Sequence, residues 1–262
     1  MNTSVHANFH ALGLSEALLR DLADAGFAAP TPIQEQAIPP ALAGRDVIGC
    51  AQTGTGKTAA FVIPIVERLA ALPKGQPQAL ILAPTRELAL QTLTTIDKLG
   101  RSRRISATVI VGGADMQAQV RGLRQRPDIL IATPGRLLDH MWNGTIVLSS
   151  MKILVLDEAD RMLDMGFAPQ INQILDALPE ERQTLLFSAT LPTDLARLVQ
   201  ANVNNPVLVM VAPSATAADG VTQGIHYTSH GEKPDLLLSL LKADQDTALV
   251  FTRTKHRADR LG

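Results

Sequence analysis

Eight consecutive residues have the composition of a loop that holds phosphate groups. The segment reads AQTGTGKT over residues 51–58 and lies between an apolar run and a helical pattern. Glycines let backbone N–H groups turn toward an anion, and the N-terminus of the next helix adds positive potential. Lys57 would hold the β and γ phosphates, and the Thr58 hydroxyl would ligate Mg²⁺. The predicted phosphate-binding residues are Ala51, which replaces the glycine usual at the first position, Gln52, Thr53, Gly54, Thr55, Gly56, Lys57 and Thr58.

Carboxylates follow a second apolar run, the sequence ILVL at residues 153–156. Asp157 at the end of this run suits a Mg²⁺ partner, and Glu158 beside it suits orienting and deprotonating a water molecule. An acidic cluster after a strand is also common as a helix N-cap or a solvated turn. The phosphate loop upstream favours the catalytic interpretation.

A third candidate group precedes the phosphate loop, in the sequence GFAAPTPIQ at residues 26–34. The carboxamide of Gln34 presents an acceptor and a donor side by side, which matches adenine and mismatches the two acceptors of guanine. Gln34 is therefore a candidate for selecting ATP, although a glutamine near a helix start is also common as a plain surface residue. Phe9 either packs on the base or belongs to the core.

Short runs rich in Val, Ile and Leu recur between longer helical patterns. They predict strands buried on both faces of a parallel sheet, and hence an α/β fold. Ligands of such sheets bind at the carboxyl ends of the strands, so the motifs should converge on one edge. The predicted strands are 46–50, 79–83, 106–111, 128–132, 153–156, 184–187 and 207–211.

The composition changes after Val211. Residues 212–220 are small, polar and prone to turns, which predicts an interdomain linker between a first domain, 1–211, and a further unit, 221–262. Roughly 40 residues are too few for an independent α/β domain, so we expect this unit to be the incomplete start of a second domain. Its predicted elements are strands at 224–228 and 248–252, a helix from about 232 to 242 and a helix from 255.

The overall charge names no partner. The chain has 262 residues, 46% of them hydrophobic, and its 24 basic and 25 acidic residues nearly cancel. A polyanion site must therefore be a local patch. Residues 101–126 contain six arginines and only Asp115 as an acid. They supply either local phosphate affinity or a solvated helix face.

Cysteine usage and hydropathy set the expected compartment. Cys50 is the single cysteine, so a disulfide within the chain is excluded. The N-terminus lacks the pattern of a signal peptide, and no apolar run is long enough for a membrane span. We expect a cytoplasmic protein with no membrane partner.

Eight short motifs resemble, in their order, those of the DEAD-box ATP-dependent RNA helicases. They are GFAAPTPIQ, AQTGTGKT, PTRELA, GG, TPGR, DEAD, SAT and VFTRT, and they cover essentially the whole chain. The sequence that flanks the motifs, such as AIPPALAGRDVIGCAQTGTGKTAAF, most resembles the bacterial RNA helicase E branch of this family. The resemblance implies an RNA-stimulated ATPase that uses ATP and Mg²⁺. It also implies a RecA-like P-loop fold, a mostly parallel central sheet flanked by helices.

The resemblance also implies roles for matching residues. Phe9 and Gln34 would recognise adenine, and Thr31 would support the phosphate loop. Hydroxyl groups, arginines and exposed glycine N–H groups suit contacts to an RNA backbone without reading its sequence. The residues facing RNA would be Pro84, Thr85, Arg86, Gly113, Thr133, Gly135 and Arg136.

The SAT motif is implied to couple hydrolysis to strand separation. Ser188 and Thr190 would do so partly through Asp160 of the DEAD motif. The implied catalytic set is Lys57, Thr58, Asp157, Glu158, Ser188 and Thr190.

One element of the family pattern is missing. The family carries an HRxGR element whose arginines complete the ATP site, and HRADR at residues 256–260 superficially imitates it. This run directly follows VFTRT and lacks the glycine, so we interpret it as the solvated face of a helix. We therefore expect the chain to stop before its arginine finger, an element that contributes strongly to phosphoryl transfer.

Three functions compete at this stage. The leading one is an ATP-dependent RNA helicase core. The second is a nucleotide-binding and weakly RNA-binding module without helicase turnover. The third, a P-loop ATPase acting on another substrate, is disfavoured by Gln34 and TPGR.

We also expect a homodimer through residues 221–262. A strand at 248–252 would have open edges, and the leucines of the preceding helix have apolar surface to bury. Symmetric exchange between two chains would meet both needs.

Overall fold

The computed structural model describes residues 8–193, 195, 198, 202–211, 222, 224–229, 231–243 and 247–261. The chain divides into two compact units, Met1–Pro213 and Ser214–Gly262, and each is described by itself. The predicted linker, 212–220, lies outside the described residues.

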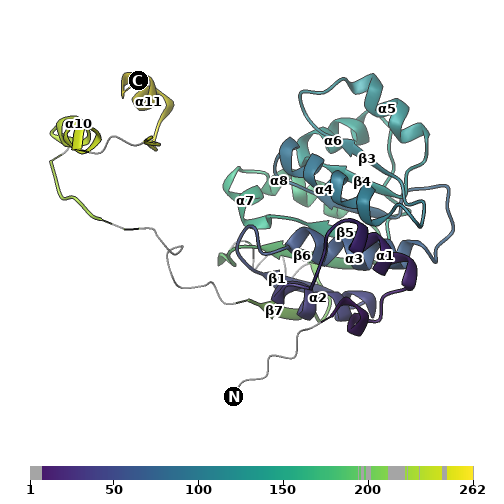
Figure 1. Cartoon of the computed structure of the whole chain (residues 1–262). Helices are drawn as coiled ribbons and strands as arrows, with labels where there is room; N and C mark the ends of the chain where they lie inside the picture. The colour runs from purple at the N-terminus through teal and green to yellow at the C-terminus, as the bar shows by residue number, and fades with distance from the viewer. Residues whose placement is uncertain are drawn as a thin grey trace, which may run out of the picture. The chain divides into compact units, whose positions relative to one another are not determined.

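One seven-stranded sheet forms the centre of the larger unit (Figure 1). The strand order is β3-β4-β2-β5-β6-β1-β7, and every pair of neighbouring strands is parallel. This confirms the α/β class and the seven strands predicted here, and the sheet is wholly rather than mostly parallel. The strands are β1 Val47–Cys50, β2 Ala79–Leu82, β3 Ala107–Ile110, β4 Ile129–Ala132, β5 Ile153–Leu156, β6 Gln183–Ser188 and β7 Val207–Met210.

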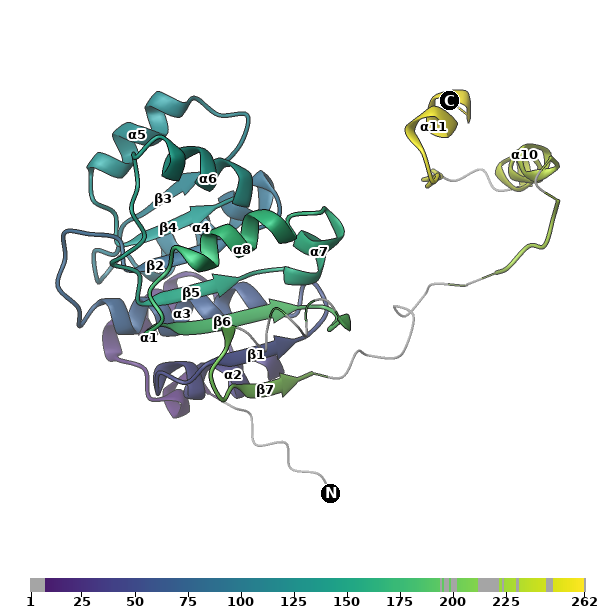
Figure 2. The same ribbon diagram turned by 180° about the vertical axis from the view of Figure 1, so that it is seen from behind.

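Alternate residues of each strand enter two different cores, one on each face of the sheet. In β5, Ile153 and Val155 face one core, while Leu154 and Leu156 face the other. Figures 1 and 2 show the helices that cover the two faces. The first face is covered by η1 Phe9–Leu12, α1 Glu16–Asp24, α2 Pro32–Leu42, α3 Lys57–Leu69 and α4 Arg86–Leu99, and the second by α5 Met116–Arg124, α6 Pro134–Trp142, α7 Ala159–Asp164 and α8 Ala168–Asp176.

Helices begin close behind the strands, at residues whose side chains or rings favour a helix start. Thr85 precedes α4, and its Oγ1 accepts a hydrogen bond from Leu88 N at 3.4 Å. Pro134 opens α6, where a missing backbone N–H costs little. The predicted RNA-facing motifs therefore lie in the turns between a strand end and a helix N-terminus.

The smaller unit contains two helices among its described residues, α10 Lys233–Ala243 and α11 Lys255–Leu261. Both were predicted. The strands predicted at 224–228 and 248–252 are wrong, because the structure gives no strand at either place. A strand exists only as part of a hydrogen-bonded ladder, and the described residues of this unit supply no partner for either segment. Residues 256–260 lie in α11 and are exposed, as expected of a solvated helix face.

None of the described helices has both the length and the apolar character needed to cross a bilayer.

Candidate functional site

Six of the predicted motifs follow strands at the carboxyl edge of the sheet, and the strand order divides them into two groups. The phosphate loop follows β1, the DEAD motif follows β5 and the SAT motif follows β6, and these three strands are neighbours. The PTRELA, GG and TPGR motifs follow β2, β3 and β4, which are also neighbours. Predicted nucleotide residues and predicted RNA residues thus occupy adjoining halves of one edge.

The phosphate loop has the backbone of an anion cradle. Gly54 and Gly56 have φ angles of 79° and 92°, which residues with a side chain rarely adopt. Lys57 is buried at the first position of α3, and its Nζ donates a hydrogen bond to the carbonyl of Ala51 at 2.5 Å. The lysine therefore folds back over the loop, and because its ammonium group has three donors it can bind phosphates while it keeps this bond.

Gln34 lies against the phosphate loop. Its Oε1 accepts a hydrogen bond from Thr31 N at 2.9 Å, and its Nε2 donates to the carbonyl of Gly56 at 3.0 Å. A Cβ on Gly56 would lie 2.4 Å from that Nε2 and 3.0 Å from Thr31 Oγ1, so only glycine fits. The carboxamide is buried and engaged at both ends, so pairing with adenine requires it to exchange these bonds.

Thr31 and Phe9 surround this contact differently. Thr31 caps α2, where its side chain faces Gln34 N in a capping box. Its buried Oγ1 makes no hydrogen bond of good geometry there, and this is the kind of polar atom that a ligand satisfies. Phe9 is 4% exposed and packs edge to face against Phe27, with ring centroids 6.3 Å apart. Of the two roles left open for Phe9, the structure displays the core role.

Asp157 stands at the end of β5 with 4% of its surface exposed. Burial, and then the charge of Glu158, raises its pKa to about 7, while the charge of Lys57 acts in the opposite direction. A carboxylate that is costly to ionise gains from a nearby cation. Carboxylate and hydroxyl oxygens are donors that Mg²⁺ prefers, so Asp157 and Thr58 of α3 fit this metal chemically.

Glu158 occupies a strained position. Its backbone is left-handed, with φ 49° and ψ 51°, at the residue that precedes α7. Strain of this kind in a residue with a side chain is concentrated at functional sites. Its Oε2 forms an ion pair with Arg161 Nη1 at 3.0 Å. Sequence reasoning missed Arg161, although its position three residues after Glu158 at a helix start is a recognisable signal.

The DEAD and SAT motifs are hydrogen-bonded to each other. Asp160 Oδ2 accepts from Thr190 N at 2.9 Å and from Thr190 Oγ1 at 2.8 Å. Ser188 Oγ accepts from Asp160 N at 3.3 Å and donates to the carbonyl of Thr190 at 2.6 Å. Burial opposes ionisation of Asp160, but the bonds from Thr190 and Ser188 outweigh it and lower its pKa. A movement of the DEAD motif must therefore displace the SAT motif or break these bonds.

The phosphate loop also touches the SAT motif. Cys50 and Ser188 are partners in the β1–β6 register, and Ala51 N donates to the carbonyl of Ser188 at 3.0 Å. The three nucleotide-side motifs are therefore connected through backbone and side-chain bonds.

The RNA-side residues differ in accessibility. Arg86 and Gly113 are exposed, and nothing lies within 4 Å of a Cβ built on Gly113 or Gly135. Pro84 is buried. Arg136 is also not freely displayed, because its Nη1 donates to the carbonyl of Ala114 at 2.9 Å and its Nε lies 3.3 Å from Asp139 Oδ2.

The arginines of residues 101–126 do not form one surface. Arg103 is mostly buried and binds Glu67 at 2.8 Å and Ser15, so it is structural. Arg121 lies on α5, 3.8 Å from Asp115. The loops before β3 and β4 carry Arg101, Arg104 and Arg126 at the amino edge of the sheet, opposite the motifs.

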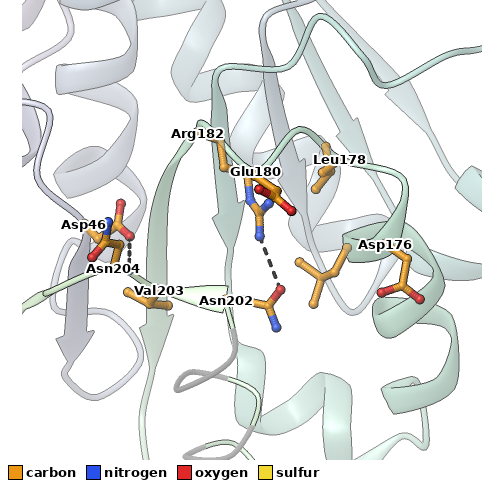
Figure 3. A pocket seen from close by; sticks show the side chains of 9 residues that line it. Asp46, Asp176, Leu178, Glu180, Arg182, Asn202, Val203 and Asn204 are labelled. Carbon is orange, nitrogen blue, oxygen red and sulfur yellow. Dashed lines mark hydrogen bonds between the residues drawn. The ribbon is translucent and has the colours of Figure 1, made fainter.

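A cavity of about 480 Å³ also lies at the amino edge (Figure 3). Asp46 before β1, Arg182 before β6 and Asn204 before β7 line it, and Arg182 Nη2 donates to Asn202 Oδ1 at 3.3 Å. Both carboxylate oxygens of Asp46 already accept hydrogen bonds, from Thr184 N at 2.7 Å and from Asn204 N at 2.6 Å. No residue of the predicted motifs lines this cavity, so we place the candidate site at the motif edge.

Comparisons with known proteins give a consistent result. A family model described as DEAD/DEAH box helicase matches residues 31–198. The DEAD-box ATP-dependent RNA helicase RhpA of Helicobacter pylori (strain B128) is 45% identical over 255 residues, 97% of this chain and 51% of that protein. The ATP-dependent RNA helicase CshA of Limosilactobacillus reuteri is 45% identical over 254 residues, with the same coverage. The chain thus spans about half the length of these relatives.

A solved structure is similar as well. It is the crystal structure of a DEAD box protein from the hyperthermophile Methanococcus jannaschii, which is 35% identical and gives a TM-score of 0.73. The match covers 97% of this chain and 68% of that one.

Proposed function

This chain belongs to the DEAD/DEAH box helicase family, and we propose that it carries the ATP-hydrolysing site and part of the RNA-binding surface of an ATP-dependent RNA helicase. The observation that supports this most is the junction of the phosphate loop, the DEAD motif and the SAT motif on neighbouring strands β1, β5 and β6. Sequence alone had indicated the same family.

ATP would bind at the phosphate loop. Lys57 would bind the β and γ phosphates with the donors that the Ala51 carbonyl leaves to it, and the N–H groups around Gly54 and Gly56 would line the triphosphate. Asp157 and Thr58 would hold Mg²⁺, with Gln52, Thr53 and Thr55 completing the loop. The metal, when bound, supplies charge neutralisation at the phosphates.

Glu158 would orient and deprotonate the attacking water. Its carboxylate is paired with Arg161 at 3.0 Å, so it must turn from that pair toward the water for the reaction.

Gln34 would select adenine, and it would also respond to the position of the phosphate loop. Because its amide binds Gly56, a phosphate loop that shifts on nucleotide binding would release the amide toward the base. Phe9 would contribute by moving from Phe27 onto the adenine ring, and Thr31 Oγ1 would gain a partner from the loop.

RNA would lie along the adjoining half of the edge. The contacts would be to phosphates and 2′-hydroxyls, with no reading of sequence. Asp160, Ser188 and Thr190 would transmit hydrolysis toward this half. The proposed RNA residues are Pro84, Thr85, Arg86, Gly113, Thr133, Gly135 and Arg136, of which Pro84 is buried.

The second candidate is a nucleotide-binding and weakly RNA-binding module without helicase turnover. It is favoured by the ion pair with Arg161, which engages the carboxylate of the proposed base Glu158. ATP hydrolysis measured with and without single-stranded RNA separates the two. Stimulation by RNA supports the helicase-type ATPase, and nucleotide binding without any stimulated turnover supports the module.

We further propose a cytoplasmic location and a homodimer through residues 221–262. Among the described residues of this segment, Ile225, Tyr227, Leu249 and Phe251 are exposed by 80, 92, 81 and 88%. Apolar surface of this extent favours a partner, and a second copy offers the same surface. Light scattering on this chain and on a version ending at Pro213 tests the dimer. The proposal is wrong if this chain is a monomer, or if the shorter version forms an equally stable dimer.

A further inference from the structure

A buried chain of hydrogen bonds lies behind the GG loop, which we define as residues 111–114. Gln119 of α5 donates from Nε2 to the carbonyl of Val111 at 2.9 Å. Its Oε1 lies 3.1 Å from Nε2 of His140 in α6, and His140 Nδ1 lies 2.8 Å from Thr145 Oγ1. Gln119 is 6% exposed and His140 is 0% exposed. The proposed function gives none of these side chains a role.

The direction of each of these hydrogen bonds follows from the first one, between Gln119 and the carbonyl of Val111. The carbonyl of Val111 only accepts, so the amide nitrogen of Gln119 faces it and Oε1 faces the histidine. His140 Nε2 must therefore carry hydrogen. Burial, and then the charge of Arg136, lowers the pKa of His140, so the ring is neutral and Nδ1 accepts. Thr145 Oγ1 then donates to Nδ1, sharing its single hydrogen with the carbonyl of His140 at 2.9 Å.

The GG loop is held at its other end by a separate bond. Arg136 of α6 donates from Nη1 to the carbonyl of Ala114 at 2.9 Å. Between the two held carbonyls, Gly112 and Gly113 are exposed, and nothing lies within 4 Å of a Cβ built on either. Figure 2 shows α5 and α6 beside β3 and β4, the strands that lead into this region. A flexible glycine pair is thus presented to solvent between two fixed points.

We propose that Gln119 and His140 are positioning residues, which hold the GG loop in the shape that contacts the RNA backbone. The proposal rests on the proposed function, because it takes Gly113 as an RNA contact. Ordering two glycines on binding costs conformational entropy, and a loop fixed in advance avoids much of that cost. If Arg136 turns to an RNA phosphate, its bond to the carbonyl of Ala114 is lost. The bond from Gln119 to the carbonyl of Val111 then fixes the GG loop.

The direction of these hydrogen bonds suggests a variant that should break one of them and keep the other. Gln119→Glu keeps the size of the side chain and an acceptor for His140 Nε2, but it sets an acceptor against the carbonyl of Val111. Gln117→Glu is the matched control, because it adds the same charge on the same helix at an exposed position. Should Gln119→Glu fail to bind ADP and so prove misfolded, Gln119→Leu removes both bonds without introducing a charge.

Three measurements on the full chain test the proposal: amide hydrogen exchange at residues 112–114, anisotropy of a labelled single-stranded RNA, and ADP affinity. For Gln119→Glu we expect faster exchange and about 3- to 10-fold weaker RNA binding, the size of one lost hydrogen bond. ADP affinity should not change, and Gln117→Glu should match the parent in exchange.

Two outcomes decide against parts of this picture. If Gln119→Glu lowers only the melting temperature, with loop exchange and RNA affinity unchanged, the two residues are merely structural and the proposal is overturned. If the parent chain binds no RNA while Gln119→Glu still speeds exchange, the RNA surface of the proposed function is wrong and the hold on the loop stands.

Discussion

Gln34 Nε2 donates to the carbonyl of Gly56 at 3.0 Å, across 22 residues of sequence. The residue proposed to read the base is therefore bonded to the loop proposed to hold the phosphates. A contact of this kind makes base recognition and phosphate binding depend on each other.

Replacing Gln34 tests this dependence. Gln34→Ala should weaken ADP and ATP binding, because the carbonyl of Gly56 and Thr31 N lose their partner in a buried place. It should also relax the preference for ATP over GTP. Competition between the two nucleotides, followed with a fluorescent ADP analogue, measures both effects. An unchanged preference would remove adenine selection from Gln34 and leave only its hold on the loop.

Lys57 and Glu158 should separate binding from chemistry. Lys57→Ala should abolish detectable nucleotide binding, since it removes the cation buried in the loop. Glu158→Gln should bind nucleotide normally and lower turnover by about 100-fold or more, because the amide keeps the shape and loses the base. Calorimetry and phosphate release give the two quantities. Equal loss of binding in both variants would contradict the division of roles.

The raised pKa of Asp157 predicts a pH-dependent stability for the chain without metal or nucleotide. The folded state keeps the proton up to a pKa of about 7, whereas the unfolded state releases it near 3.8. Between these values the folded state binds more protons, so its unfolding free energy falls as pH rises, and the loss is complete above about 7.

Asp157→Asn cannot titrate and should escape this loss. Its stability advantage over the parent should grow from about pH 5 to about pH 8, reaching on the order of 1 kcal/mol or more. Urea denaturation in the presence of a chelator measures it at each pH. A stability difference that does not vary with pH would show that Asp157 is ionised throughout.

Thr190→Val should uncouple the SAT motif from the DEAD motif. It removes the hydroxyl that binds Asp160 at 2.8 Å and leaves the backbone bond in place. We expect nucleotide affinity to stay within about twofold while stimulation of hydrolysis by RNA falls by about 5-fold or more. Thr190→Ser is the control, since it retains the hydroxyl. Equal stimulation in Thr190→Val and Thr190→Ser would argue against coupling through this bond.

Local sequence patterns were sufficient for the strands and for most motif positions. Apolar runs of strand length, such as 79–83 and 128–132, end within a residue or two of the observed strands because burial on both faces leaves a local signature. The same patterns failed at 224–228 and 248–252. Strand composition was present there, but a ladder also needs a neighbouring strand, which no local pattern guarantees.

The sequence by itself thus determined the α/β class, and it predicted candidate nucleotide-binding residues and the sheet edge at which their motifs would meet. Only the tertiary structure decided which motifs are neighbours. The strand order set β1, β5 and β6 side by side, Gly56 and Thr31 engaged the two ends of the Gln34 amide, and Asp160 met Thr190. The Gln34–Gly56 and Asp160–Thr190 contacts join residues 22 and 30 positions apart, and β1 pairs Val47 with Leu185 of β6. Contacts over such separations depend on the packing of whole elements, which residue periodicity does not encode.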